Sequence, residues 1–204
     1  MALKAVFFDV GETLVDEERW WTVRAERSGL QPHVVWAALG VTIERGEEHN
    51  ALWGHLGTER PTRWSSQLQY EREDLYPDAV PCLEPVRALG LRVGIVGNQT
   101  LALEQWARDA ALPADVISSS ESLGVRKPEP AFFGRIVELA GCAPGEVAYV
   151  GDRVDNDVVP AAAAGLVAVH VRRGPWGHLQ RTPPEARFGL NDLVSLPQAL
   201  ASLL

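Results

Sequence analysis

Short apolar runs recur along the chain, separated by stretches in which apolar residues have helical spacing. The runs are rich in β-branched and aromatic residues and stop at Gly or polar residues, as buried strands do. They lie at 5–10, 91–96, 115–118, 147–150 and 166–171. The helical stretches between them lie at 83–89, 101–111, 130–140 and 156–164. Because strands and helices alternate, the pattern predicts an α/β fold with a doubly wound parallel sheet. Residues 172–187 are expected to form an irregular loop before a short final helix.

Residues 16–80 interrupt this alternation. They contain no strand-like run, and their spacing predicts helices near 17–28, 32–39, 42–55 and 63–74. A small helical unit needs large side chains to build its own core, and most of the tryptophans here are expected to pack in that way. One or two of them that face the main domain would line an apolar pocket. Five of the seven tryptophans fall in this segment, namely Trp20, Trp21, Trp36, Trp53 and Trp64. We therefore expect a core domain at 1–15 and 81–204, with a helical cap at 16–80 inserted after the first strand.

Composition and charge exclude several classes of protein. The chain has 204 residues, which suits one compact domain with a small insertion. Its 19 basic and 27 acidic residues give a net charge of −8, and no stretch concentrates the basic ones, which disfavours nucleic-acid and membrane partners. Cys82 and Cys142 lack metal-ligand spacing and are expected to be reduced thiols. No apolar run has the length of a signal peptide or a membrane span, so we expect a cytoplasmic protein.

Acidic side chains and one lysine follow the predicted strands. Asp9 closes the first strand, Asp152 follows the strand at 147–150, and Asp157 comes one helical turn later. In a parallel sheet these strand ends meet at one edge, where the carboxylates would repel one another unless a cation neutralised them. Mg²⁺ is the commonest such ion when the substrate is a phosphate. Lys127 would add a fixed positive charge for a nucleophilic carboxylate and phosphoryl oxygens. Each residue alone is more often a cap or turn residue, and it is their joint occurrence that favours a site.

The run Lys127-Pro128-Glu129-Pro130-Ala131-Phe132-Phe133 and the pairs Gly151-Asp152 and Asn156-Asp157 resemble the third and fourth motifs of the haloacid dehalogenase superfamily. The resemblance spans nearly the whole chain and is to the branch with a helical cap between the first and second motifs. It implies a Rossmann-like core and Mg²⁺-dependent phosphoryl transfer through an aspartyl phosphate.

The resemblance also implies a role for each matching residue. Asp9 would be the nucleophile and a metal ligand, and Lys127 would be its charge partner. Asp152 and the backbone carbonyl of Gly11 would bind the metal directly. Asp157 would act on the metal from the second shell or through water.

Two departures from the family pattern bear on catalysis. Family phosphatases carry a second Asp, the general acid, two residues after the nucleophile, where this chain has Gly11. General acid catalysis typically contributes about 10²–10⁴-fold in rate, so we expect either a slow enzyme or one restricted to substrates with a good leaving group. Gly11→Asp is predicted to restore the acid. Glu12 is a candidate replacement, although an exposed carboxylate on the loop is the simpler interpretation.

The second motif usually places a Ser or Thr hydroxyl before an Asn, where this chain has Gly97 before Asn98. One phosphate hydrogen bond would then be absent, at a cost of about 1.5–3 kcal/mol. The Asn98 amide or the Thr100 hydroxyl is a candidate to replace it, although Thr100 also suits the N-cap of the next helix.

These residues predict a Mg²⁺-dependent hydrolase, most consistent with a phosphatase that acts on a small phosphorylated metabolite. A non-catalytic member that binds a phosphorylated ligand or a protein is the alternative. A haloacid dehalogenase is a minor alternative, disfavoured by the intact acidic fourth motif. Phosphonate hydrolases of the superfamily need a lysine in the cap. The only lysines here are Lys4 and Lys127, and neither lies in 16–80, so this mechanism is excluded.

Overall fold

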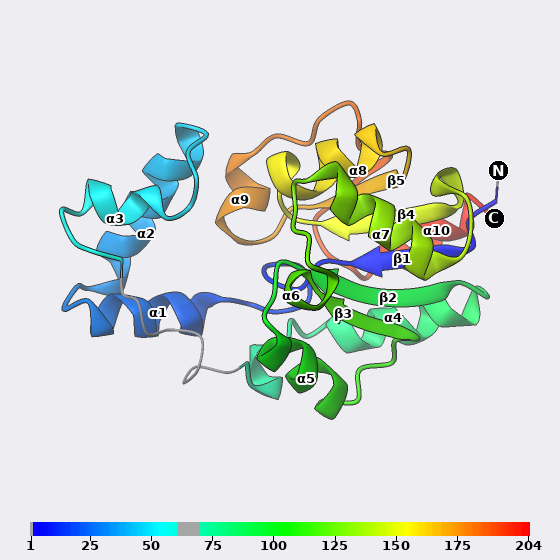
Figure 1. The fold of residues 1–204 in the computed structure, drawn as a ribbon, viewed down its shortest axis with the longest axis horizontal. Helices are drawn as coiled ribbons and strands as arrows, with labels where there is room; N and C mark the ends of the chain where they lie inside the picture. Colours follow the sequence, from blue (N-terminus) through cyan, green and yellow to red (C-terminus); the bar gives the residue numbers. More distant parts are fainter. Residues whose placement is uncertain (1, 61–69) are drawn as a thin grey trace.

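A six-stranded parallel sheet forms the centre of the molecule (Figure 1). The computed structural model describes residues 2–60 and 70–204. The strand order is β3-β2-β1-β4-β5-β6, so β1 lies in the middle of the sheet. The strands are β1 (Ala5–Phe8), β2 (Arg92–Gly97), β3 (Val116–Ser119), β4 (Val147–Gly151), β5 (Val167–Val171) and β6 (Phe188–Leu190). The predicted doubly wound parallel α/β fold is therefore confirmed.

Helices bury both faces of this sheet. On one face α4 (Ala79–Ala88), α5 (Leu101–Asp109) and α10 (Leu196–Ala201) pack in one apolar cluster with Val6 and Phe8 of β1. On the other face α7 (Pro130–Ala140) and α8 (Val159–Ala163) pack in a second cluster with Ala5 and Phe7. Because successive residues of a strand point to opposite faces, the four apolar residues of β1 contribute to both clusters. The short α6 (Ser120–Leu123) follows β3, and single helical turns lie at η1 (Arg72–Asp74), η2 (Pro144–Glu146) and η3 (Val154–Val158).

Three helices lie apart from the sheet and have an apolar cluster of their own (Figure 1). They are α1 (Glu18–Arg27), α2 (Pro32–Glu44) and α3 (Ala51–His55). Within 16–60 and 70–80, the described part of the proposed cap, the structure contains no strand. The helix expected at 63–74 falls mostly outside the described residues, as does Trp64.

The segment expected to be an irregular loop contains a helix, α9 (Gly174–Leu179), and leads directly into β6. Both elements are too short for their periodicity to be visible in the sequence. Trp176 of α9 belongs to the apolar cluster of α1, α2 and α3, with its ring centroid 6.5 Å from that of Trp21. The segment after β5 thus contributes a side chain to the cluster of these three helices. None of the helices in the described ranges combines the length and the apolar character that crossing a bilayer requires.

Candidate active site

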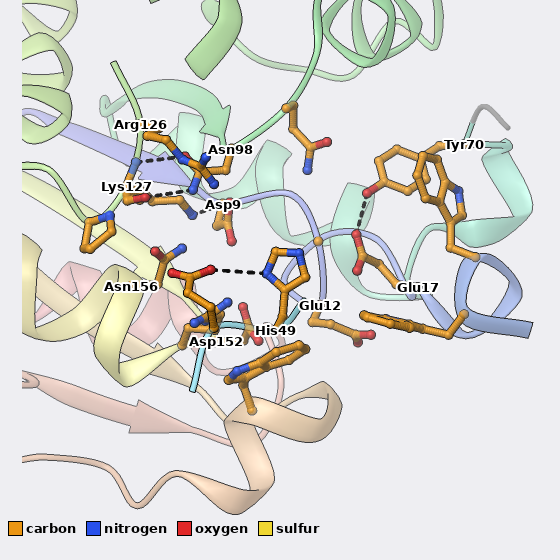
Figure 2. Close-up of a pocket in the computed structure, with 18 of the residues that line it drawn as sticks. Asp9, Glu12, Glu17, His49, Tyr70, Asn98, Arg126, Lys127, Asp152 and Asn156 are labelled. Carbon is orange, nitrogen blue, oxygen red and sulfur yellow. Dashed lines mark hydrogen bonds and ion pairs between the residues drawn. The ribbon is translucent and has the colours of Figure 1, made fainter. Parts of the chain in front are cut away.

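A cavity of about 450 Å³ lies between the carboxyl ends of the central strands and the cap helices. The core side contributes Asp9, Lys127 and Asp152 together with Arg126, and the segment between β1 and α4 contributes Glu17, His49 and Tyr70 (Figure 2). The lining includes Asp9, Gly11, Asn98, Lys127 and Asp152 from the core, and Trp20, Trp21, Arg24, His49 and Tyr70 from the segment between β1 and α4. Charged side chains at the strand ends therefore face a wall of aromatic and charged side chains.

Lys127 joins two carboxylates at the bottom of this cavity. Its Nζ lies 2.6 Å from Asp9 Oδ1 and 2.5 Å from Asp157 Oδ1. The lysine is only 2% exposed. Burial disfavours its charged form, but the two carboxylates outweigh that effect and hold the pKa of Lys127 well above its ordinary value. Lys127 is therefore a fixed positive charge against Asp9.

Asp152 is a buried carboxylate in need of a cation. Its Oδ2 has no hydrogen-bond partner, and carboxylate oxygens of Asp9, Asp152 and Asp157 lie within 4.8 Å of one another. Burial, reinforced by the negative charges of Asp157 and Asp9, raises the pKa of Asp152 well above its ordinary value. An unpaired buried carboxylate is costly, and a hard divalent cation with oxygen ligands removes that cost. The residues present thus fit Mg²⁺.

Asp157 is already engaged by the protein. Its Oδ1 contacts Lys127 Nζ, and its Oδ2 accepts a hydrogen bond of 3.0 Å from the backbone N–H of Arg153. Burial raises the pKa of Asp157, and Lys127 opposes that shift. With both oxygens occupied, Asp157 suits the indirect role expected for it.

Asn98 and Thr100 make local contacts within the protein. The side chain of Asn98 is paired with the backbone of Lys127, since its Oδ1 accepts from Lys127 N at 2.8 Å and its Nδ2 donates to Lys127 O at 3.0 Å. This pair of hydrogen bonds orients the segment that carries Lys127. Thr100 is the N-cap of α5, where its hydroxyl accepts from Leu103 N at 3.4 Å. The described lining of the cavity includes Asn98 but not Thr100.

Glu12 is buried, not an exposed carboxylate on the loop as the simpler interpretation expected. It is 4% exposed, and its backbone is left-handed, with φ of 53°. Tyr76 Oη donates to its Oε2 at 2.7 Å. Burial, with a further contribution from Glu17, raises the pKa of Glu12 to about 8. Local spacing could not predict this burial because the contact between Glu12 and Tyr76 spans 64 residues.

Arg173 anchors the loop that carries Gly11 and Glu12. Its guanidinium donates to the carbonyl of Thr13 at 2.8 Å, pairs with Asp78, and lies 4.3 Å from the centroid of the Tyr76 ring. Charge-assisted hydrogen bonds of this kind are stronger than neutral ones. The loop after β1 is therefore held in position by a residue that follows β5.

Glu17 and Tyr70 are functional candidates that the sequence pattern did not single out. Tyr70 Oη donates to Glu17 Oε1 at 2.6 Å, and both side chains line the cavity (Figure 2). An ideal Cβ built on Gly11 would lie 2.7 Å from Glu17 Oε1. In the sequence Glu17 is one of three consecutive acids, and only the fold distinguishes it from Asp16 and Glu18.

Comparison with known proteins gives consistent matches. Residues 3–165 match the family described as haloacid dehalogenase-like hydrolase. A glyceraldehyde 3-phosphate phosphatase of Methanopyrus kandleri is 30% identical over 205 residues, covering 87% of this chain and 88% of the relative. The solved structure of a HAD phosphatase from Thermococcus onnurineus aligns with a TM-score of 0.65 at 25% identity, covering 97% of this chain and 98% of that chain. A dehalogenase structure aligns with a TM-score of 0.72 at 21% identity, covering 98% and 97%, and shares the fold.

Proposed function

Because the chain belongs to the haloacid dehalogenase-like hydrolase family, we propose that this hydrolase is a Mg²⁺-dependent phosphatase of a small phosphorylated metabolite. The observation that carries the proposal is the pairing of Asp9 with Lys127 beside Asp152, whose buried Oδ2 has no partner. A phosphate group suits this arrangement because its oxygens need the positive charge that Lys127 and a metal supply. The phosphatase names of the relatives agree with it.

In the proposed mechanism Asp9 attacks phosphorus, the bond from phosphorus to the ester oxygen breaks and the alcohol leaves. Water then hydrolyses the acyl phosphate on Asp9 to inorganic phosphate. Lys127 holds the Asp9 carboxylate in place and neutralises charge on the phosphoryl oxygens. Asp9, Asp152 and the Gly11 carbonyl would hold the metal, while Asp157 fixes Lys127 and acts on the metal indirectly. Mg²⁺, when bound, supplies the charge that lets a phosphate approach three carboxylates. Asn98 orients the lysine segment, and Thr100 remains a predicted phosphate contact.

The proposed cap, residues 16–80, supplies the wall of the cavity opposite Asp9. Its Trp20, Trp21 and Arg24 lie on α1, and the guanidinium of Arg24 is 4.8 Å from the centroid of the Trp21 ring. We infer that this wall contacts the part of the metabolite that leaves. The proposed partner is a small phosphorylated substrate and neither a nucleic acid nor a membrane.

Turnover of an aryl phosphate with and without Mg²⁺ tests the proposal. Wild-type activity should require the metal, Asp9→Asn should abolish it, and Asp109→Asn, the same change at an exposed residue of α5, should leave it unchanged. A panel of phosphorylated metabolites, beginning with glyceraldehyde 3-phosphate, then identifies the substrate. Metal-independent activity, or activity that survives in Asp9→Asn, would contradict the proposal.

Two alternatives predict different outcomes. A non-catalytic member would bind phosphorylated ligands without turnover, and the glycines at 11 and 97 are the observation that favours it. A dehalogenase would release halide from a 2-haloacid without metal. Calorimetric binding to an inactive wild type would support the first, and halide release would support the second.

A further inference from the structure

When the bond between phosphorus and an ester oxygen breaks, an alkoxide leaving group needs a proton. Gly11 offers no side chain for this task. We propose that Glu17 is the proton donor and acceptor of the reaction, because its carboxyl group occupies the space that a side chain on residue 11 would fill. This inference rests on the proposed phosphatase function and adds a catalytic residue to it.

The geometry around Gly11 is the main support. An ideal Cβ on residue 11 would lie 2.7 Å from Oε1 and 3.0 Å from Cδ of Glu17. Real Cβ atoms essentially never approach another atom as closely as 2.7 Å, so a side chain at 11 and the present position of Glu17 exclude each other. Positions 11 and 17 are six residues apart, yet a side chain on residue 11 would enter the space that the Glu17 carboxyl occupies. Glycine at 11 and glutamate at 17 thus act as a pair.

Tyr70 fixes the carboxyl group of Glu17. Its hydroxyl donates to Oε1 at 2.6 Å. The tyrosine is 2% exposed, and its ring packs against Trp20 and Trp106 at centroid distances of 4.6 and 5.4 Å. A proton donor works only when it is held within hydrogen-bond reach of the reacting group, and this aromatic packing provides such an anchor.

The other carboxyl groups that line the cavity are less suitable. Asp9 and Asp152 are assigned to nucleophilic attack and metal binding, and Glu48 and Glu129 are exposed to solvent. Glu12 is buried, but its Oε2 accepts from Tyr76 and its carboxyl lies against Gly174, where an ideal Cβ would be 2.5 Å from that oxygen. Glu12 is therefore held against Tyr76 and Gly174, and the three atoms nearest to a Cβ on residue 11 all belong to Glu17.

The proton balance of the two steps is simple. Asp9 forms a bond to phosphorus, the ester bond breaks, and the alkoxide takes the proton of Glu17 to leave as an alcohol. The Glu17 carboxylate then takes a proton from the water that attacks the phosphoryl group. The bond from phosphorus to Asp9 breaks, and inorganic phosphate, the Asp9 carboxylate and protonated Glu17 result.

This pairing changes the expectation for Gly11→Asp. The sequence predicted that a second Asp would restore the acid, but in the structure its side chain would collide with Glu17. Gly11→Asp alone is expected to displace the Glu17 carboxyl from this place and to be no faster than the wild type. Gly11→Asp combined with Glu17→Ala removes the collision and returns a carboxyl to the same place.

The dependence on the leaving group tests the proposal. Kinetics on an aryl phosphate, whose leaving group needs little protonation, are compared with kinetics on an alkyl phosphate, whose leaving group needs a proton. Glu17→Gln should lower kcat on the alkyl phosphate by about 10²-fold or more, and by only a few-fold on the aryl phosphate. Glu18→Gln, the same change at an adjacent exposed residue, should affect neither substrate. The double variant Gly11→Asp/Glu17→Ala should be at least about tenfold faster than Glu17→Ala on the alkyl phosphate.

Equal losses on the two substrates, or no loss in Glu17→Gln, would overturn the assignment of Glu17 while the phosphatase function stands. A double variant no faster than Glu17→Ala would overturn it as well. Absence of any metal-dependent turnover in the wild type would overturn the proposed function and this inference together. Circular dichroism and a thermal unfolding curve for each variant separate a loss of folding from a loss of chemistry.

Discussion

The carboxylate of Asp9 lies directly against Gly97, so that a Cβ on residue 97 would collide with Asp9 Oδ1. The same oxygen is 2.6 Å from Lys127 Nζ. Space for the nucleophile in this orientation therefore depends on the glycine that replaces the hydroxyl residue of the second motif. The absence of a side chain at residue 97 thus accompanies a close contact between β2 and the residue that follows β1.

A side chain at position 97 should consequently slow the enzyme. We expect Gly97→Ala to displace Asp9 from Lys127 and to lower kcat by at least about tenfold, which corresponds to about 1.4 kcal/mol in the barrier. Gly97→Ser should recover part of this loss if its hydroxyl reaches the phosphate. Gly134→Ala is the control, because Gly134 lies exposed on α7 with nothing within 4 Å of an added Cβ. A Gly97→Ser enzyme faster than the wild type would contradict the account.

Removing the charge of Lys127 should destabilise the fold in a metal-dependent way. Lys127→Met leaves three buried carboxylates without their cation, and breaking a buried pair on one side typically costs about 3–5 kcal/mol. Urea unfolding should show this loss without metal and a smaller loss at high Mg²⁺. Lys4→Met, at the only other lysine, removes an exposed ion pair with Glu146 and should have little effect. Equal losses of unfolding free energy in Lys127→Met and Lys4→Met would contradict the view that Lys127 neutralises the buried carboxylates.

The acidic cluster should also make metal-free stability depend on pH. In the fold the pKa of Asp152 is raised, so the folded state keeps a proton that the unfolded chain has released. The contribution of Asp152 is therefore fully present below the unfolded pKa and declines as the pH rises towards the folded pKa, by up to about 1.4 kcal/mol per pH unit. Asp152→Asn removes this term, so its stability relative to the wild type should increase from pH 4 upwards.

Mg²⁺ should reverse that order. With saturating metal the wild type gains binding energy that Asp152→Asn loses, and the gain should be larger at pH 8 than at pH 5 because protons compete with the metal. Thermal unfolding of both proteins across this range, with and without Mg²⁺, measures the effect. A stability difference that does not change with pH or metal would contradict the buried position assigned to Asp152.

Trp176 should couple the cap to the core domain. It is 5% exposed, and its ring centroid lies 6.5 Å from that of Trp21. The guanidinium of Arg153 lies 4.7 Å from the Trp176 ring centroid. Trp176→Ala should cost about 3 kcal/mol in urea unfolding and raise KM, because the cap wall loses its contact with the core. Trp176→Phe should retain most of the stability and a KM close to that of the wild type. An unchanged KM in Trp176→Ala would show that the cap keeps its position without this contact.

The approach of Asp9, Lys127 and Asp152 to one another could be predicted from the positions of the strands. Asp9 and Asp152 directly follow β1 and β4, and Lys127 lies in the connection that follows β3 and α6. Parallel strands bring residues at their carboxyl ends to one edge of the sheet. The five strands predicted from apolar runs are present, because buried parallel strands are apolar on both faces and stand out in the sequence.

The remainder depends on contacts between distant residues. The strand β6 has three residues, too few for a periodic signal. Trp176 lies in the core domain by sequence, and only the approach of α9 to α2 places it in the cap cluster. Glu17 faces Gly11 because the loop folds back between β1 and α1, and local spacing carries no information about that approach.

Direct observation of the acyl phosphate on Asp9 tests the central claim. Wild-type enzyme is mixed with an aryl phosphate and Mg²⁺, quenched in acid during turnover, digested and analysed by mass spectrometry. The account predicts one phosphoryl group on the peptide that contains Asp9, absent without metal and absent in Asp9→Asn. Turnover with no phosphorylated peptide, or with the phosphoryl group on another residue, would contradict it.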